Sequence, residues 1–314
     1  MKTSNLGYPR IGENREWKKA LEQYWAGDLE ESALIEKVEA IRLNHLQKQK
    51  DSGIDILPVN DFSYYDHVLD TAVMFGIIPE RFAVSEKQPS LSTYYAMARG
   101  NVNAVAGEMT KWFNTNYHYI IPEFEEQQLV LTENKPLKAY LQAKEKLGIH
   151  GKPVILGPYT FIKLSKGYHE KQLPAIILQL VPLYIQMLRE LEEAGVEWVQ
   201  IDEPILVTDL SEDEMETVIY IYGQLQEGLT SLRLMLQTYF DAVAHYETVI
   251  KLPVHGIGLD FVHGRTKNIE NIAKFGFPED KVLAAGIIDG RNIWRSDCFE
   301  KKSIVDSLLQ KVST

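Results

Sequence analysis

Acidic and amide side chains follow several of the apolar segments that we expect to form strands. The clearest case is the short apolar run 198–201, which continues into Asp202, Glu203 and Pro204. Such a run is typical of a strand buried in a parallel sheet, and proline prevents further ladder pairing. Carboxylates at the C-terminal end of such a strand are how α/β barrels present catalytic groups. By this argument the candidates for chemistry are Asn60, Asp61, Asn116, His118, Asp202, Glu203, Tyr239, Asp260, Asp289, Arg291 and Asn292.

The two adjacent carboxylates do not suit a two-acid mechanism. Neighbouring side chains on a strand point to opposite sides, so Asp202 and Glu203 cannot both face a barrel mouth. This weakens a glycosidase interpretation, which needs two opposed carboxylates across one site. The alternative to catalysis is that one acid caps a loop while the other forms an ion pair, because structural pairs perturb carboxylates as readily as catalytic ones do.

Basic residues form a second group. Arg15, Lys18 and Lys19 lie near the start of the chain, and Lys111 is followed by two aromatic residues. One interpretation is a clamp for a polyanion beside a surface for a flat ring; the other is a solvated helix face, with Lys18 loosely paired to Glu22. One exposed charge pair is worth about 1 kcal/mol at the dielectric constant of water and about 4 kcal/mol at an effective value of 20. Several contacts in a partly desolvated groove would therefore be needed to hold a polyanion against a net charge of −11.

The sequence contains no recognisable metal-binding pattern. His118, His255 and His263 have no partner at a ligand spacing, and neither H-E-x-x-H nor C-x-x-C occurs. Cys298 is the only cysteine, which excludes an internal disulfide and a multi-thiolate metal site. We expect Cys298 to be inert, since it lies on the last predicted helix, away from the barrel mouth.

Alternating strands and helices must position these residues. Eight segments have the character of parallel strands: residues 6–12, 54–59, 114–121, 153–158, 198–201, 232–238, 254–259 and 282–288. Alternation with helices through short connections argues for a barrel or a doubly wound sheet, and the count of eight favours the (β/α)8 TIM barrel. We expect an N-terminal helix from residue 14. The long insertion between strands 2 and 3 is expected to lie on the functional face.

The bulk composition is that of an ordinary globular chain, with 314 residues, 45% hydrophobic and 25% charged. A single barrel typically has roughly 250 residues, so this length leaves room for insertions but hardly for a second full domain. We therefore expect one domain over residues 1–314. The net charge of −11 argues against nucleic-acid or anionic-membrane binding. Because no signal-peptide core or membrane-length apolar run occurs, we expect a cytoplasmic location.

Several motifs together resemble cobalamin-independent methionine synthase, and more narrowly its N-terminal half. They are residues 7–12 (GYPRIG), 15–19 (REWKK) with Tyr24 and Trp25, 58–62 (PVNDF), 66–69 (DHVL), 108–119 (EMTKWFNTNYHY), 198–204 (WVQIDEP) and 286–294 (GIIDGRNIW). The resemblance runs from residue 6 to about residue 297, and the block at 108–119 is too long to arise by chance.

The resemblance implies an enzyme of methionine biosynthesis built from two face-to-face (β/α)8 barrels. Such an enzyme transfers a methyl group from 5-methyltetrahydropteroyltri-L-glutamate, its cosubstrate, to L-homocysteine. In that family the N-terminal barrel helps to hold the folate polyglutamate, and the C-terminal barrel carries zinc and homocysteine. The family's folate-binding positions correspond here to Arg15, Glu16, Trp17, Lys18 and Lys111. We predict no catalytic residue and no metal ligand in this chain.

The chain departs from the family by ending at Thr314, where the family continues into the second barrel. The family's zinc site uses His, Glu and two Cys ligands, which cannot be assembled with one cysteine. Since zinc coordination deprotonates a thiol, the chain by itself lacks the means to activate homocysteine. We therefore expect the inactive N-terminal part of a methyltransferase, whose partner is the absent C-terminal barrel of the same enzyme.

Two alternatives belong to other classes of function. The first is a non-catalytic barrel that serves mainly as a docking scaffold for the catalytic barrel. The second is an independent barrel enzyme, such as a decarboxylase or hydrolase that uses Asp202 and Asp260. The segment around Asp202 also resembles one in the family's second barrel, so this residue is a candidate relic of duplication, retained for folding or for the barrel interface.

Overall fold

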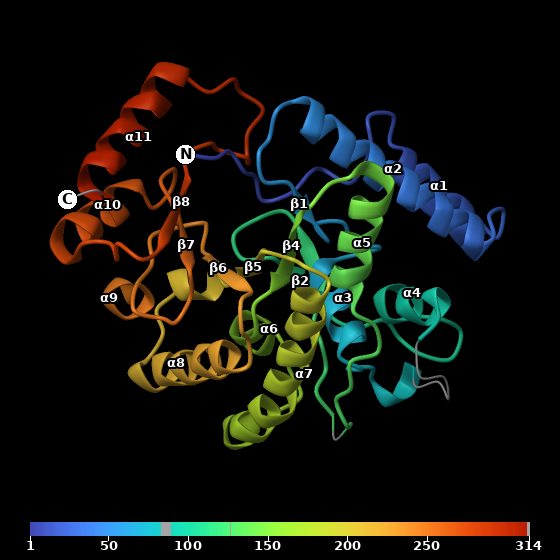
Figure 1. Cartoon of the computed structure of the whole chain (residues 1–314). Helices are drawn as coiled ribbons and strands as arrows, with labels where there is room; N and C mark the ends of the chain where they lie inside the picture. Colours follow the sequence, from blue (N-terminus) through green and yellow to red (C-terminus); the bar gives the residue numbers. More distant parts are fainter. Residues whose placement is uncertain (83–88, 126, 313–314) are drawn as a thin grey trace. The chain divides into compact units, whose positions relative to one another are not determined.

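The computed structural model describes residues 1–82, 89–125 and 127–312 (Figure 1). The chain forms two compact units. The first comprises Met1–Ile155 with Leu164–Val196, and the second comprises Leu156–Lys163 with Glu197–Thr314. Parallel strands alternate with helices in both, so the fold class is α/β with the strand–helix order of a TIM barrel.

The first unit surrounds a short parallel strand pair with helices. Strand β1 (Pro58–Val59) pairs with β4 (Lys152–Leu156), and Pro58 lies beside Lys152. The helices are α1 (Glu16–Ala26), α2 (Glu31–Asp51), α3 (His67–Met74), α4 (Leu91–Arg99), α5 (Lys135–Leu147) and α7 (Leu173–Glu193), with 3-10 turns η1 (Glu80–Phe82) and η2 (Glu170–Gln172). Helix α1 is the predicted N-terminal helix. Helices α3 and α4 lie in the predicted insertion.

Side-chain caps explain where several of these helices begin. Asp66, Ser90 and Asn134 accept hydrogen bonds from the backbone N–H three residues later, at 2.7, 3.2 and 3.1 Å. These bonds satisfy donors that the first helical turn leaves unpaired, and they start α3, α4 and α5. Gly148, with φ of 61°, ends α5 in the left-handed conformation that favours glycine.

The second unit contains four strands in parallel order. They are β5 (Trp198–Asp202), β6 (Arg233–Gln237), β7 (Gly256–Asp260) and β8 (Val282–Gly286), accompanied by α6 (Pro158–Lys163), η3 (Pro204–Val207), α8 (Glu212–Glu227), α9 (Tyr246–Val249), α10 (Arg265–Phe275) and α11 (Cys298–Val312). Asp202 pairs with Gln237, and Asp260 pairs with Gly286, so both acids end their strands at the same edge of the sheet. Gly258 lies beside Gln237 in the β6–β7 ladder, and a Cβ there would lie 2.1 Å from the end of the Gln237 side chain.

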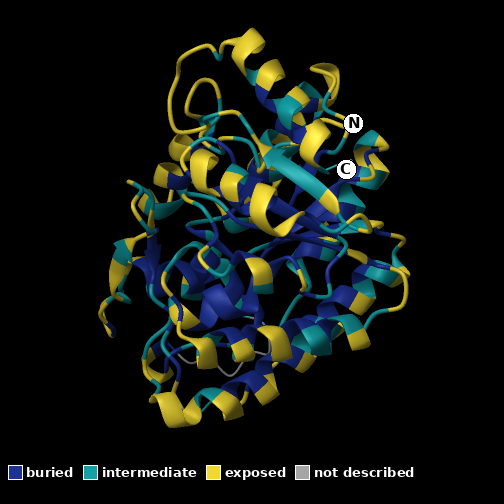
Figure 2. Cartoon of the chain, turned by 90° about the vertical axis from the view of Figure 1, so that its left-hand side faces the viewer, coloured by how far each residue is buried: buried dark blue, intermediate teal, exposed yellow. Residues whose placement is uncertain are grey.

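Apolar side chains fill the interior of each unit. Figure 2 shows helices banded with buried and exposed residues, as expected of amphipathic helices. In the first unit a buried cluster joins α1 to α4 and includes Trp17, Leu34, Phe62, Leu69 and Tyr94. In the second unit β7 is buried along its whole length, whereas β8 is exposed at both ends. Burial on both faces explains why strands such as β7 are apolar runs rather than alternating patterns.

Six of the eight predicted strand segments contain parallel strands, and two predictions were wrong. Residues 6–12 form no strand; a single parallel bridge joins Ser4 to Ile56 just before them. Residues 114–121 do not form a parallel strand either. They contain β3 (His118–Ile120), which pairs antiparallel with β2 (Met109–Lys111) in a separate hairpin. A short apolar run does not reveal its partner, so the pattern alone could not separate these two cases.

Candidate functional site

The predicted folate-binding residues 15–18 form the start of α1. Arg15 adopts the left-handed conformation, with φ of 62°, and its backbone N–H donates to Gly12 O at 3.3 Å. The Glu16 carboxylate accepts from Asn14 N at 3.0 Å. Hydrogen bonds from the backbone amides of Glu16 and Asn14 lower the pKa of Glu16. Gly12 leaves room for this carboxylate, since a Cβ there would lie 2.0 Å from Glu16 Oε2. The turn therefore defines how α1 begins.

Trp17 holds the beginning of α1 against the interior of the first unit. Its side chain is only 4% exposed. The indole packs edge-on against Phe62, with ring centroids 5.3 Å apart, and tilted against Tyr64 at 6.3 Å. Such aromatic pairs contribute about 0.5–1.5 kcal/mol beyond area burial. Trp17 therefore anchors the first turn of α1 in the core of the first unit.

Lys111 lies on the β2–β3 hairpin. It ends β2 opposite His118, and its side chain is exposed. The Trp112 N–H donates to Tyr117 O at 2.7 Å, and Thr115 Oγ1 donates to Trp112 O at 2.7 Å. These bonds close the loop at the tip of the hairpin. The expected aromatic surface beside Lys111 is altered, because Trp112 is 5% exposed and packs inward.

A buried residue, Asp66, and a half-buried one, His67, connect this hairpin to α3. Asp66 Oδ2 accepts from Ile120 N at 3.0 Å, while its other oxygen caps α3. Burial raises the pKa of Asp66 to about 7, although these backbone donors act in the opposite direction. The His67 ring lies edge-on to Trp112 at 4.3 Å and stacks on Tyr117 at 5.6 Å. Burial lowers the pKa of His67 to about 3, so the ring is a neutral packing element.

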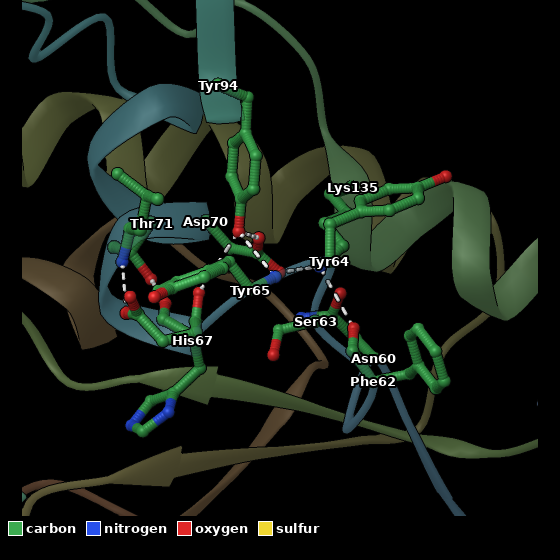
Figure 3. Close-up of polar contacts among 12 residues, drawn as sticks. Asn60, Phe62, Ser63, Tyr64, Tyr65, His67, Asp70, Thr71, Tyr94 and Lys135 are labelled. Atoms are coloured by element: carbon green, nitrogen blue, oxygen red, sulfur yellow. Dashed lines mark hydrogen bonds and ion pairs between the residues drawn. The ribbon is translucent and has the colours of Figure 1, made fainter. Parts of the chain in front are cut away.

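Arg10 joins the loop before α1 to the same support. Its Nη1 donates to Ser63 O at 3.1 Å, and the guanidinium lies over the Tyr117 ring at 5.7 Å. The start of α1 and the hairpin therefore both pack against residues 62–67. Figure 3 shows this segment beside the Tyr94 hydroxyl and Asp70. Arg10, Asp66 and His67 occur in the family-like motifs, but sequence reasoning gave them no role. The capping pattern, an acid just before a helix, could have identified Asp66.

The exposed cations of this region are weakly engaged. Lys18 forms an ion pair with Glu22 at 3.4 Å, with side chains 48% and 57% exposed. Pairs of this kind typically contribute about 0–1 kcal/mol, so an incoming anion could replace Glu22 at small cost. Arg15 and Lys111 are also exposed. The predicted basic residues thus lie on two elements of the first unit that share one support.

In the second unit, Glu203 is a structural residue. Its side chain is fully buried and accepts from Tyr159 N at 3.0 Å, Thr160 N at 2.7 Å, Thr160 Oγ1 at 2.5 Å and the Tyr222 hydroxyl at 3.2 Å. It caps the first turn of α6, a structural role as in the alternative to catalysis, although the capped element is a helix rather than a loop. Burial raises the pKa of Glu203 to about 7 against the effect of these donors. Gly157 makes the approach possible, because a Cβ there would lie 2.1 Å from the carboxyl carbon.

Asp202 and Asp260 have different partners from Glu203. Asp202 accepts from Gln200 Nε2 at 2.7 Å and from the Tyr239 hydroxyl at 3.1 Å. Asp260 accepts backbone N–H bonds at both oxygens, at 2.7, 2.9 and 3.0 Å, and thereby shapes the loops that follow β6 and β7. A carboxylate occupied in this way is poorly placed to act as a general base. These contacts therefore do not favour an independent hydrolase or decarboxylase that uses this pair.

The remaining strand-end candidates have local structural partners. Asn60 adopts φ of 66°, and its side-chain amide donates to Val154 O at 2.8 Å. Asp61 accepts a hydrogen bond from Tyr8 N, and burial raises the pKa of Asp61. His118 Nδ1 lies 2.9 Å from Asn116 O.

The loop after β8 contains the last three candidates. Asp289 accepts from Arg291 N at 2.8 Å and from Asn292 Nδ2 at 2.6 Å. The backbone donor lowers the pKa of Asp289. These bonds form a turn within the exposed segment.

No group of three or more His, Cys, Asp or Glu side chains in the described ranges is placed to hold a metal ion. Cys298 is exposed at the first residue of α11. The His255 ring accepts from Leu234 N at 3.2 Å. Over the same ranges, none of the helices has the length and apolar character needed to cross a bilayer.

Comparison with known proteins decides the family. Residues 2–313 match the family model for the N-terminal domain of cobalamin-independent synthase. The chain belongs to the cobalamin-independent methionine synthase family. It is 60% identical over 313 residues to the 5-methyltetrahydropteroyltriglutamate–homocysteine methyltransferase of Halalkalibacterium halodurans, and 54% identical over 312 residues to that of Bacillus licheniformis. These matches cover 100% and 99% of the chain but 41% of each relative, so the chain spans less than half the length of these synthases.

Solved structures of the family share the fold at low sequence identity. A putative vitamin-B12-independent methionine synthase from Listeria monocytogenes aligns with a TM-score of 0.67 at 14% identity, covering 99% of this chain and 88% of that chain. A B12-independent methionine synthase from Shewanella sp. W3-18-1 aligns with a TM-score of 0.66 at 17% identity, covering 91% and 80%. At this identity the likeness concerns the fold alone.

Proposed function

We propose that this chain is the N-terminal part of a methyltransferase that moves a methyl group from 5-methyltetrahydropteroyltri-L-glutamate to L-homocysteine. Its contribution is to hold the folate polyglutamate through Arg15, Glu16, Trp17, Lys18 and Lys111. The observation that carries this proposal is the location of three exposed cations: Arg15 and Lys18 at the start of α1, and Lys111 on the β2–β3 hairpin. Both elements pack against residues 62–67. The 60% identical relative, named for this reaction, supports the choice of substrate.

The charges of the site suit a polyglutamate better than a folate with a single glutamate. Each added glutamate brings one more carboxylate, and an exposed pair contributes only about 0–1 kcal/mol. Affinity therefore has to come from several pairs formed together by one flexible tail. Trp17 and Glu16 contribute indirectly, because the first anchors α1 in the core and the second closes the turn before it.

The chemical step requires residues that this chain does not supply. Homocysteine reacts as a thiolate, and zinc bound in a C-terminal barrel would supply that ionisation. The residues of this chain bind and orient the methyl donor. We therefore expect no turnover by the isolated chain.

Calorimetric titration of the chain with triglutamyl and monoglutamyl 5-methyltetrahydrofolate tests the proposal. We expect tighter binding of the triglutamyl form, and loss of this preference in Lys18→Ala and Lys111→Ala. Lys302→Ala is the matched control, because Lys302 is also an exposed lysine paired with an acid four residues later. Equal affinity for both folates, or an equal effect of all three substitutions, would contradict the proposal.

A second candidate function is that of a docking scaffold for the catalytic barrel. The specific observation in its favour is a group of exposed apolar side chains around the start of α11. Ile293, Trp294 and Phe299 are 93%, 79% and 88% exposed. The three residues fall within positions 293–299 of the sequence, and large exposed apolar side chains mark interaction sites where they form a contiguous patch.

Mixing the chain with a separately produced C-terminal barrel of the Halalkalibacterium halodurans relative distinguishes the two functions. Stable complex formation without any folate binding by this chain would favour the scaffold. A tail-length preference in the chain alone would favour the folate-binding role. Analytical ultracentrifugation of the mixture and the folate titration together give the answer.

A further inference from the structure

A cavity of about 360 Å³ lies in the first unit, and none of the proposed folate-binding residues lines it. Its walls come from α2, α3, α4 and α5 and from residues just before α3, α4 and α5. Its apolar lining includes Ile35, Val38, Val73, Met74 and Leu91. Sites for small molecules usually measure about 300–1,000 Å³ and combine an apolar lining with a few convergent polar groups. This cavity therefore has room for a ligand with a short apolar body.

Among the cations of the lining, Arg42 alone forms no ion pair within the described residues. Burial lowers the pKa of Arg42. In the described part of the chain its guanidinium donates to one side chain, the amide oxygen of Gln142. The Gln142 amide in turn donates to Glu39 at 3.3 Å, so the hydrogen bonds of Arg42 reach a carboxylate only through Gln142. A guanidinium has five N–H donors, and buried charges are normally paired directly. Arg42 is therefore suited to a carboxylate from a ligand.

Tyr64 offers a second donor near Arg42. Burial raises the pKa of Tyr64 to about 12, and the charge of Arg42 acts in the opposite direction. Figure 3 shows the Tyr64 hydroxyl directed away from Asp70. The other donors beside Asp70 are already used, since the Tyr94 hydroxyl donates to it at 2.6 Å and Lys135 forms an ion pair with it. Arg42 and Tyr64 are the pair of donors that a ligand carboxylate could use.

The charges of the lining select between kinds of ligand. Its carboxylates are Glu31, Glu39, Asp70 and Glu133, and its cations are Arg42, Lys135 and Lys138. A simple anion would enter a lining with more negative than positive groups, and a simple cation would meet the Arg42 guanidinium, which has no direct ion pair in the described part of the chain. A zwitterion avoids both penalties.

We propose that this cavity binds an α-amino acid with an apolar side chain. Its carboxylate is held by Arg42 and Tyr64, and its side chain packs against the apolar walls. Its ammonium group is held by Glu31, the lining carboxylate that forms no ion pair within the described residues. None of the proposed folate-binding residues lines the cavity, although Tyr64, which does, also packs against Trp17.

Isothermal titration of the chain with L-leucine and L-methionine at millimolar concentration tests this site. Two truncated probes separate the contributions: 4-methylpentanoate lacks the ammonium group of leucine, and isoamylamine lacks its carboxylate. We expect both amino acids to bind and each truncated probe to bind at least about tenfold more weakly, as loss of a charge-assisted hydrogen bond implies. Absence of binding by either amino acid, or equal binding of isoamylamine and leucine, would overturn the proposal.

Three variants locate the site. Arg42→Met keeps a long side chain without its charge and should weaken leucine binding by at least about tenfold. Ile35→Trp places a large ring at the cavity from an exposed position, so it should abolish binding without disturbing the core. Glu36→Trp, at the next exposed position of α2 and outside the lining, is the matched control and should bind normally. If Arg42→Met does not fold, Ile35→Trp against Glu36→Trp decides, and equal affinity in these two variants would refute the site.

Discussion

Replacement of Glu203 by glutamine tests how burial competes with hydrogen bonding at a carboxylate. The Glu203 side chain is fully buried and accepts four hydrogen bonds, two from Thr160, one from the Tyr159 N–H and one from the Tyr222 hydroxyl. Glutamine has nearly the same shape but presents an NH2 group to some of these donors. Leaving a buried donor without an acceptor costs about 1–3 kcal/mol, so Glu203→Gln should destabilise the chain.

The size of this loss should depend on pH. Burial raises the pKa of Glu203 from 4.5 to about 7, which means that the folded chain binds the proton more tightly than the unfolded chain does. The stability that Glu203 contributes is therefore fully present below about pH 4.5 and is lost as the pH rises through about 7. At about 1.4 kcal/mol per pKa unit, the total change approaches about 3 kcal/mol. Glutamine does not titrate. The penalty of Glu203→Gln should consequently shrink by up to about 3 kcal/mol between about pH 5 and pH 8.

Urea denaturation of both proteins across this pH range measures the penalty directly. Glu214→Gln is the control, because the hydrogen bond from Lys163 lowers the pKa of Glu214 to about 2 and its penalty should be flat over the same range. If the penalty of Glu203→Gln grows with pH instead, the four donors outweigh burial. The pKa of Glu203 would then be lowered rather than raised, and burial would not be the dominant influence on this carboxylate.

Three further substitutions have expected outcomes. Gly12→Ala should destabilise the chain by about 1–3 kcal/mol in a thermal melt, because φ is 80° and the new Cβ would overlap the Glu16 carboxylate; an unchanged melting temperature would contradict this. Asp66→Asn should cost about 1–3 kcal/mol and speed hydrogen exchange at the Ile120 amide, which now donates to this carboxylate. Slow exchange in the variant would show that the bond does not hold the hairpin. Asp202→Asn should reduce thermal stability more than triglutamyl-folate affinity, and the reverse order would give Asp202 a place in the folate site.

The sequence by itself determined the features that depend on neighbouring residues. The apolar run 198–201 followed by two acids predicted a buried strand with carboxylates at its end, and β5 ends at Asp202. Alternation of side chains along a strand also predicted that Asp202 and Glu203 would have different surroundings, which they do. The exposed cations Lys18 and Lys111 were located by charge alone. Local periodicity, caps and charge require no knowledge of the chain's path.

Only the tertiary structure decided which distant residues meet. Residues 114–121 have the pattern of a barrel strand, but their pairing with β2 makes them half of an antiparallel hairpin. The four donors to Glu203 come from α6 and α8, and no spacing in the sequence indicates that a carboxylate would bind the first turn of α6. Likewise, the packing of His67 against Trp112 and Tyr117, and the cavity beside Arg42, bring together segments separated by dozens of residues. Such contacts depend on the path of the whole backbone, because burial and hydrogen bonding are satisfied in space rather than along the chain.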